Sequence, residues 1–463
     1  MRSRLAAHLN QPIDIASLVA FRILWGAVLC LGTLRFMLNG WVEILYAQPR
    51  MFFKYSGFEW VQAWPVWGMY LHYSLLCLLA LCVALGLFYR VSIVLFTVGF
   101  AYAQLIDQTN YLNHYYLVVW LGLLMSCLPL GSYGSFDVWR RSAPKRTQIP
   151  AWMLYLLRFQ IAVVYVNAGL AKFNSDWLLH AQPLHIWLGA RTEIPLIGPL
   201  LAQGWVAYAF SWVGFIYDCS IVLFLSWPRT RLWAYGIVLI FHGLTQVFFD
   251  IGLFPILMTT GALLFFSPSW PHQAKSWLQR RFGSTALTSS ARSETTSSTQ
   301  ERSLQLRPWA YALLGVYALF QLLMPLRHHL YSGDVLWHEQ GMRYAWKVMV
   351  REKNGSITYH VHSPSRQRSW QVSPMQYLTW RQANEMSGQP DMILQLAQHI
   401  AQDFRQRGIK DVEVRAEALV SLNGRPQALL IDPKTDLTQV HDGIKPASWI
   451  LPKPHSMPLK ALR

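Results

Sequence analysis

The sequence has few charged residues, and acidic residues are the scarcest of them. Only 14% of the 463 residues are charged, whereas 53% are hydrophobic, and 23 Asp and Glu stand against 40 Lys and Arg. A typical soluble domain carries about 25% charged residues, so this composition argues against a soluble enzyme. The formal net charge of +17 would suit nucleic acid. Because the basic residues gather in the connections between apolar runs, we expect no nucleic-acid partner.

Cysteine and the common catalytic motifs are also lacking. The five cysteines lie in apolar segments without CxxC or Cys/His metal spacing, so we expect small core residues and no disulfide: Cys30, Cys77, Cys82, Cys127 and Cys219. We find no HExxH, P-loop, GxSxG or GxGxxG motif. Three histidine pairs lack neighbouring acids or cysteines and are expected to be interfacial or strand-surface residues rather than metal ligands: His180 and His185, His328 and His329, His360 and His362.

What the sequence does contain is a series of long apolar runs. Crossing ~30 Å of hydrocarbon takes about 20 helical residues. Candidate spans lie at about 15–38, 70–89, 91–107, 115–131, 151–172, 205–227, 232–249, 251–267 and 308–327. The first run is too long for the apolar region of a signal peptide and has no small-residue cleavage site. We therefore expect a polytopic α-helical membrane bundle of about nine transmembrane helices, in contact with the lipid bilayer.

The basic residues predict the orientation of this bundle. They fall on alternate connections, which all lie on one side of the membrane: Arg2 and Arg4, Arg90, Arg140 to Arg146, Arg229 and Arg231, and the Lys/Arg-containing segment 272–307. By the positive-inside rule this side is cytoplasmic. We therefore expect a cytoplasmic N-terminus and, after the ninth span, an extracytoplasmic C-terminal region.

Composition divides the chain into four parts. We expect membrane helices 1–8 with the active site in 1–270, a cytoplasmic Ser/Thr-rich linker in 271–307, the last membrane helix in 308–327 and a β-rich outer domain in 328–463. The stretch "GSTALTSSARSETTSSTQERS" in the linker has little means of building a core.

Local patterns give the outer domain its predicted elements. Apolar and polar residues alternate around Asn354-Gly355, which predicts a β-hairpin there. The stretch "MILQLAQHIAQDFRQRG" has a helical period and ends at Gly408. A second strand pattern surrounds Asn423-Gly424. These patterns predict a β-rich domain with at least one amphipathic helix.

Three polar groups fall on the outer side of this topology. The first is the loop "DQTNYLNHYYL" (107–117), which includes Asn113 and His114. The second is Lys172, where the fifth span ends. The third is His242, about 12 Å inward from the outer end of its helix at 1.5 Å per residue. Because these groups share one side of the bundle, they favour a site there.

Taken alone, Lys172 has two interpretations. It is either a cation that reaches toward the membrane surface from a helix end or a buried base. A free lysine has a pKa of ~10.4, and an apolar pocket disfavours its cation, so a buried amine can take a proton from a weakly acidic hydroxyl. Taken singly, Arg22, Arg158 and Asp218 are equally compatible with structural contacts and with function.

The order of the motifs along the chain resembles the vitamin K-dependent gamma-carboxylases and their bacterial relatives. The residues that carry the resemblance in the bundle are "LVAFRILWG", "NHYYL", "VNAGLAKFNSDWL", "FHGLTQVFFDIGLF" and "FFSPSWP". Beyond the bundle, "FQLLMPLRHHLY", "GMRYAWKVMV" and "RPQALLIDPKTDL" resemble the family's last helix and lumenal domain. The animal enzymes have two adjacent lysines in the third motif, and here the first of them is Ala171.

The resemblance implies roles for four residues. Lys172 aligns with the base that deprotonates reduced vitamin K, and His114 aligns with a histidine associated with carboxylation; these two are the expected catalytic residues. Asn113 aligns with the asparagine near the hydroquinone oxygen, and His242 with a position in the family's Phe-His region; these two are the expected cofactor-binding residues. The implied co-substrates are reduced vitamin K (phylloquinol or menaquinol), O2 and CO2, without a metal, and the implied partner is a glutamate-containing peptide or protein.

Three hypotheses about function remain open at this point. The first is a gamma-carboxylase that forms the 2,3-epoxide of vitamin K and couples this to γ-carboxylation of glutamate. The second is a hydroquinone epoxidase that carboxylates nothing. The third is a non-enzymatic membrane scaffold that binds a quinone or lipid. We expect a bacterial inner-membrane protein in each case.

Overall fold

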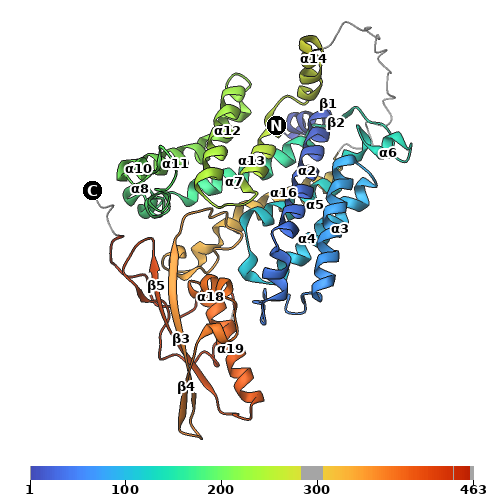
Figure 1. Cartoon of the computed structure of the whole chain (residues 1–463). Coiled ribbons are helices and arrows are strands. Elements are labelled where there is room, and N and C mark those ends of the chain that lie inside the picture. The colour runs from blue at the N-terminus through green and yellow to red at the C-terminus, as the bar shows by residue number, and fades with distance from the viewer. Residues whose placement is uncertain (1, 283–305, 442, 459–463) are drawn as a thin grey trace.

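Long apolar helices make up the first part of the chain, and a small sheet with two helices makes up the last part (Figure 1). The computed structural model describes residues 2–282, 306–441 and 443–458. The N-terminus, α6 (Phe136–Trp139) and α14 (Trp270–Phe282) lie at one end of the bundle, and the sheet domain lies at the other end (Figure 1). The structure therefore separates the N-terminal end of the bundle from the sheet domain, as the sequence predicts.

Each of the nine expected spans contains a helix. These helices are α2 (Ala16–Leu38), α3 (Val66–Leu85), α4 (Tyr89–Leu105), α5 (Asn113–Cys127), α7 (Trp152–Ala171), α11 (Gly204–Ser226), α12 (Arg231–Phe248), α13 (Phe254–Ala262) and α16 (Pro308–Leu323). In the described residues, five helices are long and apolar enough to cross a membrane: α2, α3, α7, α11 and the segment Trp309–Leu330.

The remaining helices of the bundle are shorter or less apolar. The clearest case is α13, which with its 3-10 extension covers Phe254–Phe265. At 1.5 Å per residue this segment is about 18 Å long, well short of ~30 Å of hydrocarbon. The predicted membrane bundle is therefore confirmed, whereas nine complete spans are not.

The expected linker, residues 271–307, begins with a helix. Helix α14 covers Trp270–Phe282, so the first part of this segment is helical. The Ser/Thr-rich stretch 283–303 lies outside the described residues, and its role as a cytoplasmic linker stays a prediction.

Two arginines of the bundle, the buried Arg22 and the partly buried Arg158, have structural roles. Arg22 donates to the carbonyl oxygens of Leu130 at 2.7 Å and Gly134 at 2.6 Å. Arg158 donates to backbone carbonyls at 2.7 and 2.9 Å. Carbonyl groups left free by helix ends need donors, and these guanidinium groups supply them. Of the three intramembrane charges that the sequence left open, only Asp218 remains a candidate for function.

The last part of the chain is built on an antiparallel sheet with the strand order β4-β3-β5-β6. Its strands are β3 (Lys353–Ser363), β4 (Arg368–Val372), β5 (Glu413–Leu422) and β6 (Ala428–Leu429), and its two longer helices are α18 (Trp380–Ser387) and α19 (Pro390–Gln406). Gly408, at φ +86°, follows α19, as the helical pattern predicts. We call residues 328–458 the outer domain.

The predicted hairpin at Asn354-Gly355 is wrong. Both residues lie inside β3, and Gly355 pairs with Val420 of β5. Glycine is needed there for a different reason, because a Cβ on Gly355 would lie 2.9 Å from the carbonyl oxygen of Ser387. The strand pattern predicted around Asn423-Gly424 is confirmed, because β5 precedes these two residues, β6 follows them, and the two residues form a turn.

That turn directly follows β5 and has left-handed backbone at both positions, with φ +51° and +76°.

The outer domain packs directly on the bundle. Gln382 of α18 donates to Asp107 Oδ2 at 2.9 Å, and Arg381 donates to the carbonyl oxygen of Thr109 at 2.9 Å. Asp107 is a buried carboxyl outside the helices, and burial raises its pKa although Thr109 and Gln382 donate to it. The polar loop 107–117 is therefore partly a docking surface for the outer domain.

Candidate functional site

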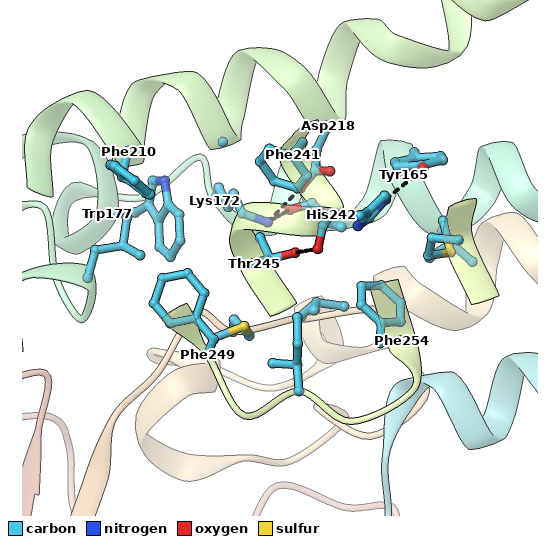
Figure 2. Close-up of a pocket in the computed structure, with 18 of the residues that line it drawn as sticks. Tyr165, Lys172, Trp177, Phe210, Asp218, Phe241, His242, Thr245, Phe249 and Phe254 are labelled. Carbon is cyan, nitrogen blue, oxygen red and sulfur yellow. Dashed lines mark hydrogen bonds and ion pairs between the residues drawn. The ribbon is translucent and has the colours of Figure 1, made fainter. Parts of the chain in front are cut away.

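An apolar pocket lies where α7, α11 and α12 meet the outer domain (Figure 2). Its walls are aromatic and aliphatic apart from a few polar side chains. The lining residues include Tyr165, Lys172, Trp177, Phe210, Asp218, Phe241, His242, Phe249, Phe254 and Met349. We call this cavity the main pocket. Two of the four residues singled out from the sequence, Lys172 and His242, line it.

Lys172 caps the C-terminal end of α7. Its ammonium is buried and lies 2.7 Å from Asp218 Oδ2 of α11, with a second bond of 3.2 Å to the carbonyl oxygen of Ala168. Lys172 therefore does not reach out to the membrane surface, and that interpretation is wrong. A buried lysine needs a partner because an isolated charge in an apolar medium is strongly disfavoured.

The ring of Trp177 lies against the other side of the Lys172 ammonium. The Lys172 Nζ lies 5.3 Å from the centre of the Trp177 ring. Trp177 is fixed by bonds at both its backbone and its ring: its N–H donates to Asn174 Oδ1 at 3.0 Å, and Nε1 donates to the carbonyl oxygen of Ser211 at 2.8 Å. Asn174 is the N-cap of α8 (Ser175–His180). The Asn-x-x-Trp spacing thus places an aromatic face over the lysine.

His242 of α12 also lines the main pocket, on the same side as Lys172 in the view of Figure 2. The hydroxyl groups of Tyr165 and Tyr217 lie 3.0 and 3.4 Å from its Nε2. Its Nδ1 is buried and has no hydrogen-bond partner in the described part of the chain. Buried polar atoms in folded proteins are nearly always paired, so an unpaired one beside a cavity calls for a ligand atom.

The outer domain completes the wall of the main pocket. Val348 and Met349, which precede β3, line it together with the helices. Trp187 of α9 (Leu184–Gly189) also lines it, and its Nε1 donates to Glu352 at 2.6 Å. The pocket therefore belongs to neither part of the molecule alone.

A second ion pair ties the outer domain to the loop after Lys172. Arg425 donates from Nη1 and Nη2 to the two carboxylate oxygens of Asp176, both at 2.6 Å, and Asn423 adds a bond of 2.9 Å. Burial alone would raise the pKa of Asp176, but the bonds from Arg425 and Asn423 outweigh it and lower the pKa. The Asn423-Gly424 turn thus positions the side chains that hold Asp176.

Asn113 and His114 do not line the main pocket. His114 lines a second cavity on the far side of α13, and its ring lies 6.1 Å from the Phe254 ring, which does line the main pocket. Asn113 donates to the carbonyl oxygen of Lys347 at 3.4 Å, next to Val348 of the pocket wall. The structure therefore brings Lys172 and His242 together in the main pocket. Asn113 and His114 lie outside it, behind the residues that form its wall.

Two family models match the chain. The HTTM domain matches residues 10–270, and the vitamin K-dependent gamma-carboxylase lumenal domain matches residues 306–456. The first covers more than half of the chain, and the second covers the outer domain. The chain belongs to the vitamin K-dependent gamma-carboxylase family. It is thus a carboxylase-like membrane protein with an extracytoplasmic domain, and no solved structure matches it.

A gamma-carboxylase family member needs a place for a naphthohydroquinone, and the main pocket fits one. The space between its walls, open solvent included, is about 670 Å³. Aromatic walls suit a flat ring, and Lys172 and His242 Nδ1 offer polar atoms for the ring oxygens. Among the described residues no cluster of three metal-ligating side chains occurs.

Sequence reasoning missed Asp218 and Tyr165 as site residues. Asp218 could have been found from the sequence. An acid within a membrane helix usually pairs with a base, and Lys172 is the basic residue at the most similar depth in the membrane. Tyr165 had none, since one more tyrosine in an aromatic-rich bundle is indistinguishable from a core residue. Their contribution depends on helix packing that the sequence does not reveal.

Proposed function

We propose that this protein oxygenates a reduced naphthoquinone of the vitamin K type to its 2,3-epoxide and couples this reaction to γ-carboxylation of glutamate in a peptide. The observation that carries the proposal is the buried Lys172–Asp218 pair in an aromatic pocket that His242, with its unpaired Nδ1, also lines. The reduced naphthoquinone supplies, with O2, a base strong enough for a glutamate γ-proton, which no side chain can remove.

The Lys172–Asp218 pair acts as one base. Burial alone disfavours a charged lysine, whereas the carboxylate at 2.7 Å stabilises the ammonium form. Lys172 passes one proton to Asp218 and takes another from the substrate hydroxyl, so the pair gains a single positive charge. The resulting ammonium lies beside the oxyanion that has just formed, and it stabilises that anion in a water-poor pocket.

His242 binds the substrate. When the tyrosine hydroxyls donate to Nε2, at 3.0 Å from Tyr165 and 3.4 Å from Tyr217, Nδ1 carries the proton. It then donates to the second ring oxygen of the substrate. Asn113 acts through the 347–349 segment and positions the pocket wall, while His114 serves the carboxylation half.

The reaction balances with water as the second product. The hydroquinone and O2 give the epoxide and H2O, while the glutamate γ-carbon loses a proton, and its electron pair forms a bond to the carbon of CO2. The peptide reaches the site from the extracytoplasmic side, where the outer domain lies. This placement assumes nine spans, a cytoplasmic N-terminus and a bacterial inner membrane, as the distribution of basic residues favours.

A second candidate function is epoxidation without carboxylation. The observation that favours it is the separation of His114 from the main pocket. Lys172, Asp218 and His242 would suffice for the hydroquinone half of the reaction, whatever happens to CO2.

A paired assay tests the proposal and separates the two functions. Purified protein receives reduced vitamin K, O2, labelled CO2 and a glutamate-containing peptide, and both epoxide and labelled peptide are measured. Wild type is expected to form both products. His114→Ala is expected to keep epoxide formation and to lose labelling by on the order of 100-fold.

The outcomes are distinct. Epoxide without labelled peptide in wild type would leave the epoxidase as the function. Absence of both products, with the quinone bound, would overturn the proposal in favour of a quinone-binding scaffold.

A further inference from the structure

An open groove with mostly apolar walls lies beside α6, at the end of the bundle opposite the outer domain (Figure 1). Three elements form these walls: α2 with Ile23, the end of α3 with Ala84 and Leu85, and α6 with Phe136 and Trp139. We call it the α6 groove. Ile23 lies seven residues, or about 10 Å, along α2 from its first residue. The groove therefore extends from the ends of the membrane helices into the apolar layer.

The segment that carries α6 is fixed to the bundle by two side chains. The Asp137 carboxylate accepts hydrogen bonds from the backbone N–H groups of Phe88 and Tyr89, both at 2.8 Å, at the start of α4. Arg22 donates to the carbonyl oxygen of Gly134 at 2.6 Å, just before α6. The walls of the groove are thus ordered before any ligand binds, which lowers the entropic cost of binding.

The aromatic side chains of α6 remain exposed at the groove. Trp139 is 77% exposed, and its ring lies 5.8 Å from that of Phe136 in an edge-to-face arrangement. Tryptophan is enriched in membrane proteins where hydrocarbon meets the lipid headgroups. The exposed side chains of Ile23 and Leu85 continue the apolar surface. These walls fit an acyl chain better than a polar ligand.

Basic side chains gather where α6 ends. Residues 136–146 contain one acidic residue and four basic ones, Arg140, Arg141, Lys145 and Arg146. Arg140 pairs with Asp137 at 2.9 Å. Arg141 and Lys145 are exposed and make no ion pair within the part of the chain that the structure describes. Their charges are therefore accessible to an anion.

The backbone of Arg141 is unusual. Its φ of +58° is in the left-handed region, directly after Arg140, the C-cap of α6. Glycine is the usual residue in this conformation, because a side chain is strained there. An arginine at this position destabilises the local backbone, and a use for its charge would explain why it is there.

Apolar walls and exposed cations together describe one class of ligand. A phospholipid with a negatively charged headgroup, such as phosphatidylglycerol, matches both the walls and the charges of Arg141 and Lys145. Phosphatidylcholine matches only the walls, because its choline cation cancels the charge of its phosphate. A soluble phosphate matches only the charges. Charge complementarity therefore favours an acidic phospholipid.

We propose that the α6 groove binds an acidic phospholipid. Its acyl chain lies between α2, α3 and α6, and its phosphate contacts Arg141 and Lys145. The positive-inside rule predicts that this end of the bundle faces the cytoplasm, where acidic lipids attract basic segments. The inference is independent of the proposed function, because the main pocket lies beside the outer domain, at the other end of the bundle.

Native mass spectrometry of the full chain in a neutral detergent tests the charge requirement. Arg141→Gln combined with Lys145→Gln removes both exposed cations. Arg280→Gln combined with Arg281→Gln is the matched control, because it removes the same charge from exposed residues of α14 at the same end. A basic residue near a membrane surface contributes about fivefold to binding. We expect the Kd for phosphatidylglycerol to rise about 10–30-fold in the first variant and less than about twofold in the control.

A phosphatidylglycerol with a photoreactive acyl chain locates the site. After irradiation, wild type should give adducts in the peptides that contain Ile23, Leu85 and Trp139. Arg141→Gln combined with Lys145→Gln should give about tenfold fewer adducts at the same lipid concentration. Glycerol phosphate, which has the charge but no acyl chain, should not compete with the lipid.

Four results would each overturn the inference: equal Kd values for the two double variants, equal binding of phosphatidylglycerol and phosphatidylcholine to wild type, competition by glycerol phosphate at the concentration of the lipid, and adducts only in other helices. A lipid-independent dimer that prevents the adducts would assign the groove to a second copy of the chain instead. Lipid binding as expected, without epoxide formation, would contradict the proposed function alone.

Discussion

Two buried ion pairs lie on either side of one short loop, and they differ in how completely their atoms are bonded. Asp176 receives three hydrogen bonds from Arg425 and Asn423, between 2.6 and 2.9 Å. Asp218 has a single 2.7 Å bond from Lys172, and both side chains line the main pocket. We call Asp176–Arg425 the outer pair and Lys172–Asp218 the inner pair. The carboxylate of the outer pair is fully hydrogen-bonded, whereas the inner pair can still bond to a ligand.

The difference shows how burial of similar groups leads to different roles. Arg425 has a planar guanidinium that binds both oxygens of a carboxylate and stays charged, so the outer pair cannot exchange protons. Lys172 has an amine whose proton can move. The outer pair fixes the loop, and the inner pair, four residues earlier in the chain, carries out the proposed proton transfer.

Breaking the inner pair on the lysine side should have the largest effect. Lys172→Ala removes the base, and we expect epoxide formation to fall by about 10²–10⁴-fold, the usual contribution of a general base. Lys172→Arg is the matched variant, because it keeps a cation opposite Asp218 but cannot give up its proton. We expect it to be as inactive as the alanine variant. Epoxide formation near the wild-type rate in Lys172→Arg would show that only the charge matters.

Breaking the outer pair should affect stability more than chemistry. Arg425→Ala leaves the buried carboxylate of Asp176 without its cation, a change that typically costs about 3–5 kcal/mol. We expect lower thermal stability, measured by the melting temperature in detergent, and less than a tenfold loss of epoxide formation per folded molecule. Arg425→Ala combined with Asp176→Asn should recover part of the stability, because no charge is then left unpaired.

The outer pair should also make the stability of the protein depend on pH in the acid range. The folded-state pKa of Asp176 is below its usual 3.8, so the unfolded chain binds more protons in this range. The stabilisation is thus present above about pH 4 and is lost as the pH falls through the lowered pKa. Melting temperatures of wild type and Arg425→Ala should converge toward that acid limit. A constant difference down to the lowest accessible pH would contradict this assignment.

Much of the fold could be predicted because lipid-facing helices must be apolar along their whole length. Each predicted span contains a helix, and the ends of α7 at Ala171 and α19 near Gly408 follow from local residues. The Asn354-Gly355 hairpin could not be distinguished from a strand, since the glycine serves a close approach of Ser387 from far along the chain.

The candidate site was predictable one residue at a time but not as an arrangement. Lys172 and His242 carried local signals, and both line the main pocket. The placement of His114 behind α13 depends on how the helix packs after the Gly252 turn, which has φ +62°. Asp218 required knowing that α11 lies against α7, a contact between residues that are 46 positions apart.

The most direct test of the paired base is epoxide formation by Asp218→Asn, with hydroquinone binding measured on the same preparation. We expect hydroquinone binding to persist while epoxide formation falls by on the order of 100-fold, because Lys172 then has no acceptor for its proton. If Lys172 works alone as a neutral amine, removing the carboxylate would leave the rate unchanged or raise it. A wild-type or faster rate in Asp218→Asn would therefore show that Lys172 and Asp218 do not act as one base.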